Sequence, residues 1–173
     1  MYSVAIIGAG PSGLACAEQL VQMGHSVTIF DAKPAPGGLL TYGIPNFKIP
    51  KEIVFSRIAD LERAGVKFIP NTCIGKEKKI DDLFSEGFQA IFVGVGTLID
   101  APMEVPGEDL PGVYKATDFL ARASLPLDLL PPDLRKRPEI GNRVVVIGGG
   151  DTASDCLRTA LRLGAHEVTC LYR

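Results

Sequence analysis

The sequence predicts an α/β fold with a doubly wound parallel sheet. Segments rich in β-branched and aromatic residues alternate with amphipathic segments, which is the order expected of strand–helix units. The strand segments lack a clean polar alternation, as is typical of strands that are buried on both faces. We expect strands at 3–8, 26–30, 66–69, 90–95, 143–148 and 167–172, and helices at 12–23, 51–64 and 151–163.

The helix expected at 51–64 has one apolar side, formed by Val54, Ile58 and Leu61. Its other sides carry charged side chains that we expect to face water: Lys51, Glu52, Asp60 and Glu62. Gly65 follows this segment as a stop signal. The pattern is typical of a helix that packs against the protein core through one apolar side and exposes its other sides to water.

The two ends of the chain repeat one another at an offset of 140 residues. Gly8 matches Gly148 and Gly10 matches Gly150, and Gly13 matches Ala153, with Cys16/Cys156 and Gly24/Gly164 as further pairs. One extra residue near 165 then shifts the second strand. Such a repeat is stronger evidence for two related units than either motif alone.

Proline-rich stretches divide the chain. Residues 34–50 contain four prolines and three glycines, and we expect an extended loop there. Residues 124–142 are expected to be a linker, in which the basic cluster 135–137 is a solvated face. We therefore expect a first, incomplete nucleotide-binding domain at 1–123, a linker at 124–142, and the opening strand, helix and strand of a second domain at 143–173.

Composition limits the function classes. The net charge of −2 and pI of about 5.7 give no basic footprint for nucleic acid or for an anionic membrane. The first apolar run is broken by Gly8 and Gly10, so no membrane segment is expected. Four scattered cysteines and two histidines show no metal-ligand spacing, which favours reduced thiols in a cytoplasmic protein without a metal site.

The first glycine turn has the pattern of a dinucleotide-binding fingerprint. Gly8 permits the strand-to-helix turn, Gly10 lets a pyrophosphate approach the backbone, and Gly13 lets the helix pack close to the strand. Asp31 follows the second strand and is suited to accept hydrogen bonds from a ribose. The pair Gly37–Gly38 comes five residues after this acid, a spacing that accompanies FAD in flavoproteins with two dinucleotide-binding domains.

The second glycine turn differs at the coenzyme-selecting positions. Ala153 replaces the third glycine, a variant that the fingerprint allows. Tyr172 stands where the first unit has its acid, and Arg173 follows it. An acid there repels a 2′-phosphate, whereas an arginine pairs with it, so these residues indicate NADP rather than NAD.

The chain resembles the small (beta) subunits of NADPH-dependent glutamate synthases, and is similar to the matching part of dihydropyrimidine dehydrogenases. The segments that carry the resemblance are "GAGPSGLACA", "PGGLLTYGIPNFKIPKEI", "AIFVGVGT", "GVYKATDFL" and "GGGDTASDCLRTALRLGAHEVTCLYR". It implies a Rossmann-like FAD domain interrupted by an NADPH domain. Electrons would pass from NADPH to FAD and onward through iron–sulfur clusters in missing or partner domains, including a large catalytic subunit.

The resemblance also implies which residues hold the cofactors. For FAD these are Gly8, Gly10, Pro11, Ser12, Gly13, Asp31, Gly38, Leu39 and Lys48, with Ile74 near the adenine. For NADPH they are Gly149, Gly150, Asp151, Thr152, Tyr172 and Arg173. No catalytic side chain is expected, because the cofactors themselves carry out hydride transfer.

The chain departs from the family pattern in three ways, and other functions stay open beside the family's. The chain lacks the family's cluster-binding domain and closing FAD segment, and its NADPH domain stops after the second strand. We therefore expect a fragment that binds FAD weakly if at all and shows no NADPH-driven turnover alone. It would leave a sheet edge and an apolar helix face uncovered. The alternatives are a non-catalytic nucleotide-binding or assembly module, and the FAD/NADPH half of a dihydropyrimidine dehydrogenase or ferredoxin–NADP reductase type enzyme. A simple NAD dehydrogenase is disfavoured by the second glycine pair.

Overall fold

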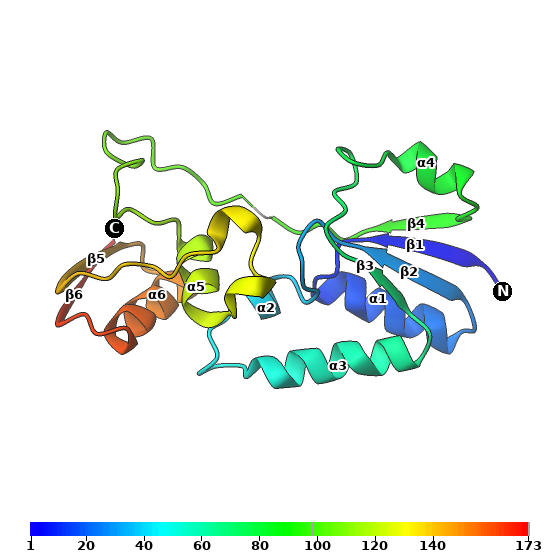
Figure 1. The fold of residues 1–173 in the computed structure, drawn as a ribbon, viewed down its shortest axis with the longest axis horizontal. Helices are drawn as coiled ribbons and strands as arrows, with labels where there is room; N and C mark the ends of the chain where they lie inside the picture. Colours follow the sequence, from blue (N-terminus) through cyan, green and yellow to red (C-terminus); the bar gives the residue numbers. More distant parts are fainter. Residues whose placement is uncertain (98, 173) are drawn as a thin grey trace. The chain divides into compact units, whose positions relative to one another are not determined.

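The computed structural model describes residues 1–97 and 99–172, and these form two compact units (Figure 1). The first unit comprises residues 1–41 and 49–97, and the second comprises 42–48 and 99–172. These units do not follow the boundaries expected at 123 and 142. The second unit takes in 99–123 and a short segment, 42–48, that lies between two parts of the first unit along the chain.

The first unit is built on a parallel four-stranded sheet in the order β3-β2-β1-β4. Its strands are β1 (Ser3–Ile7), β2 (Ser26–Phe30), β3 (Lys67–Ile69) and β4 (Ala90–Val93). Its helices are α1 (Pro11–Gln22), α3 (Lys51–Arg63) and α4 (Ile80–Ser85), and the short α2 (Leu39–Tyr42) ends at the boundary with the second unit. The predicted doubly wound parallel arrangement is confirmed.

Helices cover both faces of this sheet (Figure 1). On one face, Ile6 and Ile29 are fully buried against apolar residues of α1 and α3. On the other, Ile7 and Phe30 pack against Leu83 of α4. Side chains of a strand point alternately to its two faces, so apolar residues at successive positions supply both layers of core.

The second unit contains β5 (Arg143–Ile147) and β6 (Glu167–Leu171), which pair in parallel. Helix α6 (Asp151–Arg162) follows β5 and packs beside α5 (Ala116–Ser124); two 3-10 turns, η1 (Leu127–Leu129) and η2 (Pro132–Leu134), follow α5. Val144, Val146 and Val168 contact the buried cluster of α5 and α6. The opposite sheet face exposes Val145, Ile147 and Leu171 by 53–58%. It is thus a sheet face, rather than the helix face expected from the sequence, that lies uncovered.

Residues 124–142 are packed more tightly than a linker. Leu125 and Leu130 are both fully buried. Arg122 and Arg137 each donate to the other's main-chain carbonyl O, at 3.2 and 2.7 Å, and Arg135 Nε donates to Leu130 O at 3.0 Å. The basic cluster 135–137 is exposed, as expected of a solvated face, although Arg135 and Arg137 also donate hydrogen bonds to main-chain carbonyls.

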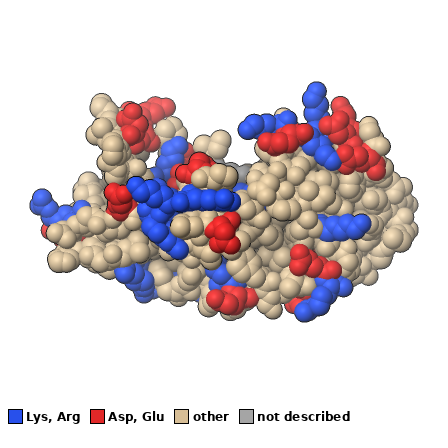
Figure 2. All heavy atoms as spheres, viewed as in Figure 1, with Lys and Arg blue, Asp and Glu red and all other residues tan. Residues whose placement is uncertain are grey.

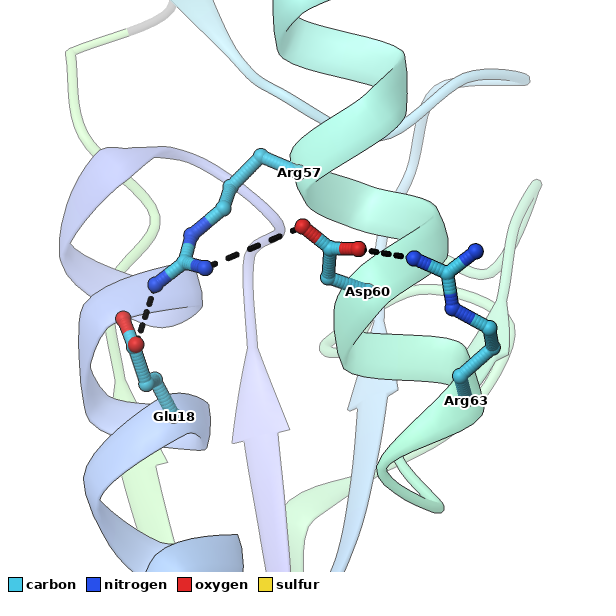
Figure 3. Close-up of polar contacts among 4 residues, drawn as sticks. All are labelled: Glu18, Arg57, Asp60 and Arg63. Atoms are coloured by element: carbon cyan, nitrogen blue, oxygen red, sulfur yellow. Dashed lines mark hydrogen bonds and ion pairs between the residues drawn. The ribbon is translucent and has the colours of Figure 1, made fainter.

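Charges on the surface are mixed in sign. On the face shown in Figure 2, basic and acidic side chains lie interspersed within each unit. In the first unit, Arg57 of α3 pairs with Glu18 of α1, and Asp60 pairs with Arg63 (Figure 3). Hydrogen bonding to Glu18 raises the pKa of Arg57. The Arg57–Glu18 pair links the two helices and the Asp60–Arg63 pair lies within α3, although exposed ion pairs contribute little to stability.

Candidate functional site

The two glycine turns are the same structure repeated. Gly8 N donates to Phe30 O and Gly148 N donates to Leu171 O, both at 2.8 Å. Each turn then leads to a helix through a glycine N-cap in extended conformation, Gly10 before α1 and Gly150 before α6. The internal repeat predicted from the sequence is therefore a repeat of backbone hydrogen bonds as well as of residues.

Two glycines of the first turn are required by the fold itself. Gly8 has a positive φ of 101°, and an added Cβ would lie 2.4 Å from the carbonyl O of Gly94. A Cβ on Gly13 would lie only 2.0 Å from the carbonyl O of Gly8. Neither site has room for a side chain, because helix α1 and the segment after β4 approach the turn so closely.

The middle glycine is different. Gly10 has an ordinary φ of −76°, and an added Cβ would meet only the Cα of Gly38, at 4.0 Å. Leu14 N makes the first bond of helix α1, to Gly10 O, so the N–H groups of Ser12 and Gly13 have no intrahelical acceptor. Pro11 supplies no N–H, and the first turn carries no acidic residue. The space before α1 is thus suited to an anion.

Asp31 already takes part in the turn. Its Oδ2 accepts a hydrogen bond from Ala9 N at 2.6 Å, and its Oδ1 accepts one from Lys33 N at 2.8 Å. A cavity of about 10 Å³ beside it is lined by Pro36 and Phe68, among others. Each carboxylate oxygen can accept a further bond. Asp31 therefore orders the turn and keeps acceptor capacity for a ligand hydroxyl.

The second glycine pair packs on the first turn. Gly37 N donates to Ala9 O at 2.8 Å, and a Cβ on Gly38 would lie 2.7 Å from the Cα of Gly10. Both glycines have positive φ, 114° and 54°. The spacing that predicted FAD therefore places one backbone directly against another, and the neighbouring Leu39 is 47% exposed.

The turn before α6 leaves an open hollow of about 700 Å³, lined by Ile147, Gly148, Gly149, Leu171 and Tyr172. A Cβ on Gly150 would meet nothing within 4 Å, whereas one on Gly149 would lie 3.1 Å from the Tyr172 side chain. Asp151 and Thr152 form the first turn of α6. Arg173, the residue predicted to select NADP, lies outside the described residues.

Lys48 belongs to the second unit, whereas the other predicted FAD residues belong to the first. Its Nζ is 2.5 Å from Oδ1 of Asp155, a buried acid of α6. The neighbouring Phe47 ring lies under the guanidinium groups of Arg158 and Arg162, at 4.3 and 4.0 Å. Asp155 was not among the residues predicted from the sequence, although an acid on the buried side of an amphipathic helix indicates that a partner is present.

Ile74 and two of the cysteines lie in packed surroundings. Ile74 packs beside the cluster of Phe30 and Leu83. Burial raises the pKa of the Cys156 thiol to about 11 and also raises that of Cys16, so both thiols are protonated and unreactive at neutral pH. Among residues 1–97 and 99–172, no group of three or more metal-ligating side chains comes together.

Comparison with known proteins identifies the family. The model of the pyridine nucleotide-disulphide oxidoreductases matches residues 2–173. The chain belongs to this family. It is 48% identical over 173 residues to the glutamate synthase [NADPH] small chain of Halomonas elongata, which covers 98% of this chain and 36% of that protein.

Two further proteins place the chain within longer relatives. The putative oxidoreductase AegA of Escherichia coli is 48% identical over 176 residues, covering 98% of this chain and 26% of that protein. The structure of Mycobacterium tuberculosis FprA in complex with NADPH superposes with a TM-score of 0.77 at 26% identity, over 98% of this chain and 43% of FprA. The chain therefore spans less than half of each of these proteins. None of the described helices is long and apolar enough to cross a membrane.

Proposed function

We propose that the chain is the nucleotide-binding part of an electron-input module, in which the first unit binds FAD and the turn before α6 binds NADPH. Gly10 and Gly150 carry this proposal. Both have ordinary backbone angles and open space at the missing Cβ, so the protein itself has no need of glycine there. A pyrophosphate that approaches the backbone from outside would account for both.

In the first unit, the groups present fit FAD. The free N–H groups at the start of α1 would bind the phosphates, and Asp31 would accept a ribose hydroxyl. Gly38 and Leu39 would face the ligand across the turn, with Gly8, Pro11, Ser12 and Gly13 shaping it. When bound, FAD supplies a flavin that accepts a hydride.

In the second unit, the hollow beside Gly149 would take the dinucleotide, and Asp151 and Thr152 would flank it. Tyr172 in place of an acid, followed by Arg173, favours the 2′-phosphate of NADPH over the free hydroxyl of NADH. Lys48 and Ile74 stay predictions as FAD contacts. The glutamate synthase small chain among the relatives supports a module that passes electrons to a large subunit or to an iron–sulfur domain in the cytoplasm.

A second candidate is a non-catalytic module that assembles with a larger protein. The apolar side chains exposed on the β5–β6 sheet, Val145, Ile147 and Leu171, favour this alternative. It predicts that neither nucleotide binds.

The test compares two alanine variants. Gly10→Ala and Gly150→Ala should each cost at most about 1 kcal/mol of stability, because only an N-cap preference is changed. By titration, Gly10→Ala should lose FAD binding and keep NADPH binding, and Gly150→Ala should do the reverse. Gly141→Ala is the matched control, since it also has ordinary angles and open space. No FAD binding by the unaltered chain up to roughly 1 mM would contradict the proposal.

A further inference from the structure

A buried lysine lies beside the second glycine turn of the first unit. Lys51, the first residue of α3, is only 4% exposed, although the sequence pattern predicted that it faces water. Its Nζ donates a hydrogen bond to the carbonyl O of Leu40 at 2.7 Å. Burial lowers the pKa of Lys51 to about 8. An ammonium in such a place is costly unless its hydrogen bonds are made.

The carbonyl that Lys51 holds belongs to a helix too short to satisfy itself. Helix α2 has only four residues, so its carbonyl groups, including that of Leu40, lack N–H donors within the helix. Lys51 therefore anchors Leu40, and with it the end of the glycine turn, to the start of α3.

The other side of the same turn is also fixed. Gly37 N bonds to Ala9 O, and Thr41, which is fully buried, donates through Oγ1 to Pro36 O at 2.7 Å. A Cβ on Gly37 would lie 2.0 Å from Thr41 Oγ1 and 3.1 Å from a methyl of Val54, one turn after Lys51. The turn is thus held between the first fingerprint and helix α3.

We propose that Lys51 is a positioning residue for the flavin pocket: by holding Leu40 O it fixes the backbone of Gly37, Gly38 and Leu39 against the phosphate-binding turn. This inference rests on the proposed binding of FAD by the first unit. A turn that is already ordered before binding spares the ligand the cost of ordering it. An apolar side chain would fill the same space without the desolvation cost, but it would leave the Leu40 carbonyl unheld.

The test uses Lys51→Met, which keeps the length but has no donor, and Lys51→Arg, which restores both donor and charge. Lys67→Met is the control, because Lys67 is an exposed lysine of the same unit. Two measurements are made on the 173-residue chain at pH 7: amide hydrogen exchange by NMR, and FAD titration.

Lys51→Met should speed exchange of the hydrogen-bonded Gly37, Leu40 and Thr41 amides at least tenfold more than that of Ile6 and Ile29 in the sheet. It should weaken FAD binding by about tenfold, and Lys51→Arg should recover most of both effects. Equally faster amide exchange throughout the first unit would overturn the inference, because Lys51 would then contribute only to general stability. Unchanged amide exchange at the turn would also overturn it, because Lys51 would then not hold the turn. The exchange result stands without ligand, so failure of FAD to bind the unaltered chain would count against the proposed function alone.

Should Lys51→Met fail to fold, Thr41→Val removes a second bond of the same turn without touching a charge. Faster exchange confined to 37–41 in this variant, together with weaker FAD binding, would support the positioning role of the turn. Unchanged FAD affinity with a loosened turn would overturn it.

Discussion

The third position of the glycine fingerprint, Gly13 in the first turn and Ala153 in the second, gives a test in which the sign of the stability change decides. In a helix, alanine is more favourable than glycine by about 1 kcal/mol, so Gly13→Ala would stabilise α1 if space allowed. An added Cβ would lie 2.0 Å from Gly8 O, and real Cβ contacts are essentially never under 3.0 Å. Helix α1 must therefore move by about 1 Å, which is overpacking of a kind that typically costs 1–3 kcal/mol.

We expect Gly13→Ala to destabilise the first unit by about 2 kcal/mol, whereas Ala153→Gly should cost the second unit about 1 kcal/mol through helix propensity alone. Native-state hydrogen exchange at Ile6 and Val146 reports each unit separately. A Gly13→Ala variant that is as stable as the unaltered chain, or more stable, would refute the close approach of α1 to its strand.

Two further predictions concern lysines. Lys48→Met leaves the buried carboxylate of Asp155 unpaired and should destabilise the second unit by about 2 kcal/mol; this is less than for a fully buried pair, because Lys48 is 35% exposed. The double variant Lys48→Met/Asp155→Leu should recover stability. Equal hydrogen-exchange rates in the unaltered chain and both variants would show that the pair contributes nothing to stability. Lys51 has a pKa of about 8 in the folded state and an ordinary value of 10.5, so between these values the unfolded chain binds more protons. The stability of the unaltered chain relative to Lys51→Met should therefore rise from pH 8 to pH 10.5 and stay flat below pH 8; a falling difference in urea denaturation would contradict the burial of the charge.

Much of the fold follows from patterns that are local in the sequence. Alternation of apolar strands with glycine turns and helices predicted the sheet and the repeat, because a parallel sheet requires a crossover between its strands. The short helices α4 and α5 were missed. Their apolar residues, such as Leu83 and Phe119, are too few to show a period, and they become helical through packing against the sheet and against α6.

The site was predicted unevenly for a physical reason. Glycines whose role is backbone conformation, such as Gly8 and Gly37, can be identified from spacing, because steric limits act between near neighbours. Partners that are far apart in the sequence cannot be identified in this way. Lys48 pairs with Asp155, 107 residues away. Lys51 is buried by its contact with the Leu40 carbonyl, which the apolar pattern of residues 51–64 does not reveal. Charge in a sequence predicts exposure only until a specific partner overrides it.

The path of the chain through residues 42–48 limits how this protein can be divided. Tyr42 OH donates to Leu129 O, Asn46 donates to Ser124 O, and Lys48 pairs with Asp155. The side chains of this segment therefore contact residues that come some 80 to 107 positions later in the chain. Truncation after β4 would therefore deprive an early loop of its hydrogen-bond partners, even though every strand of the first sheet would remain. Ribosomal synthesis meets the same constraint, because this loop can reach its final contacts only after α6 has emerged.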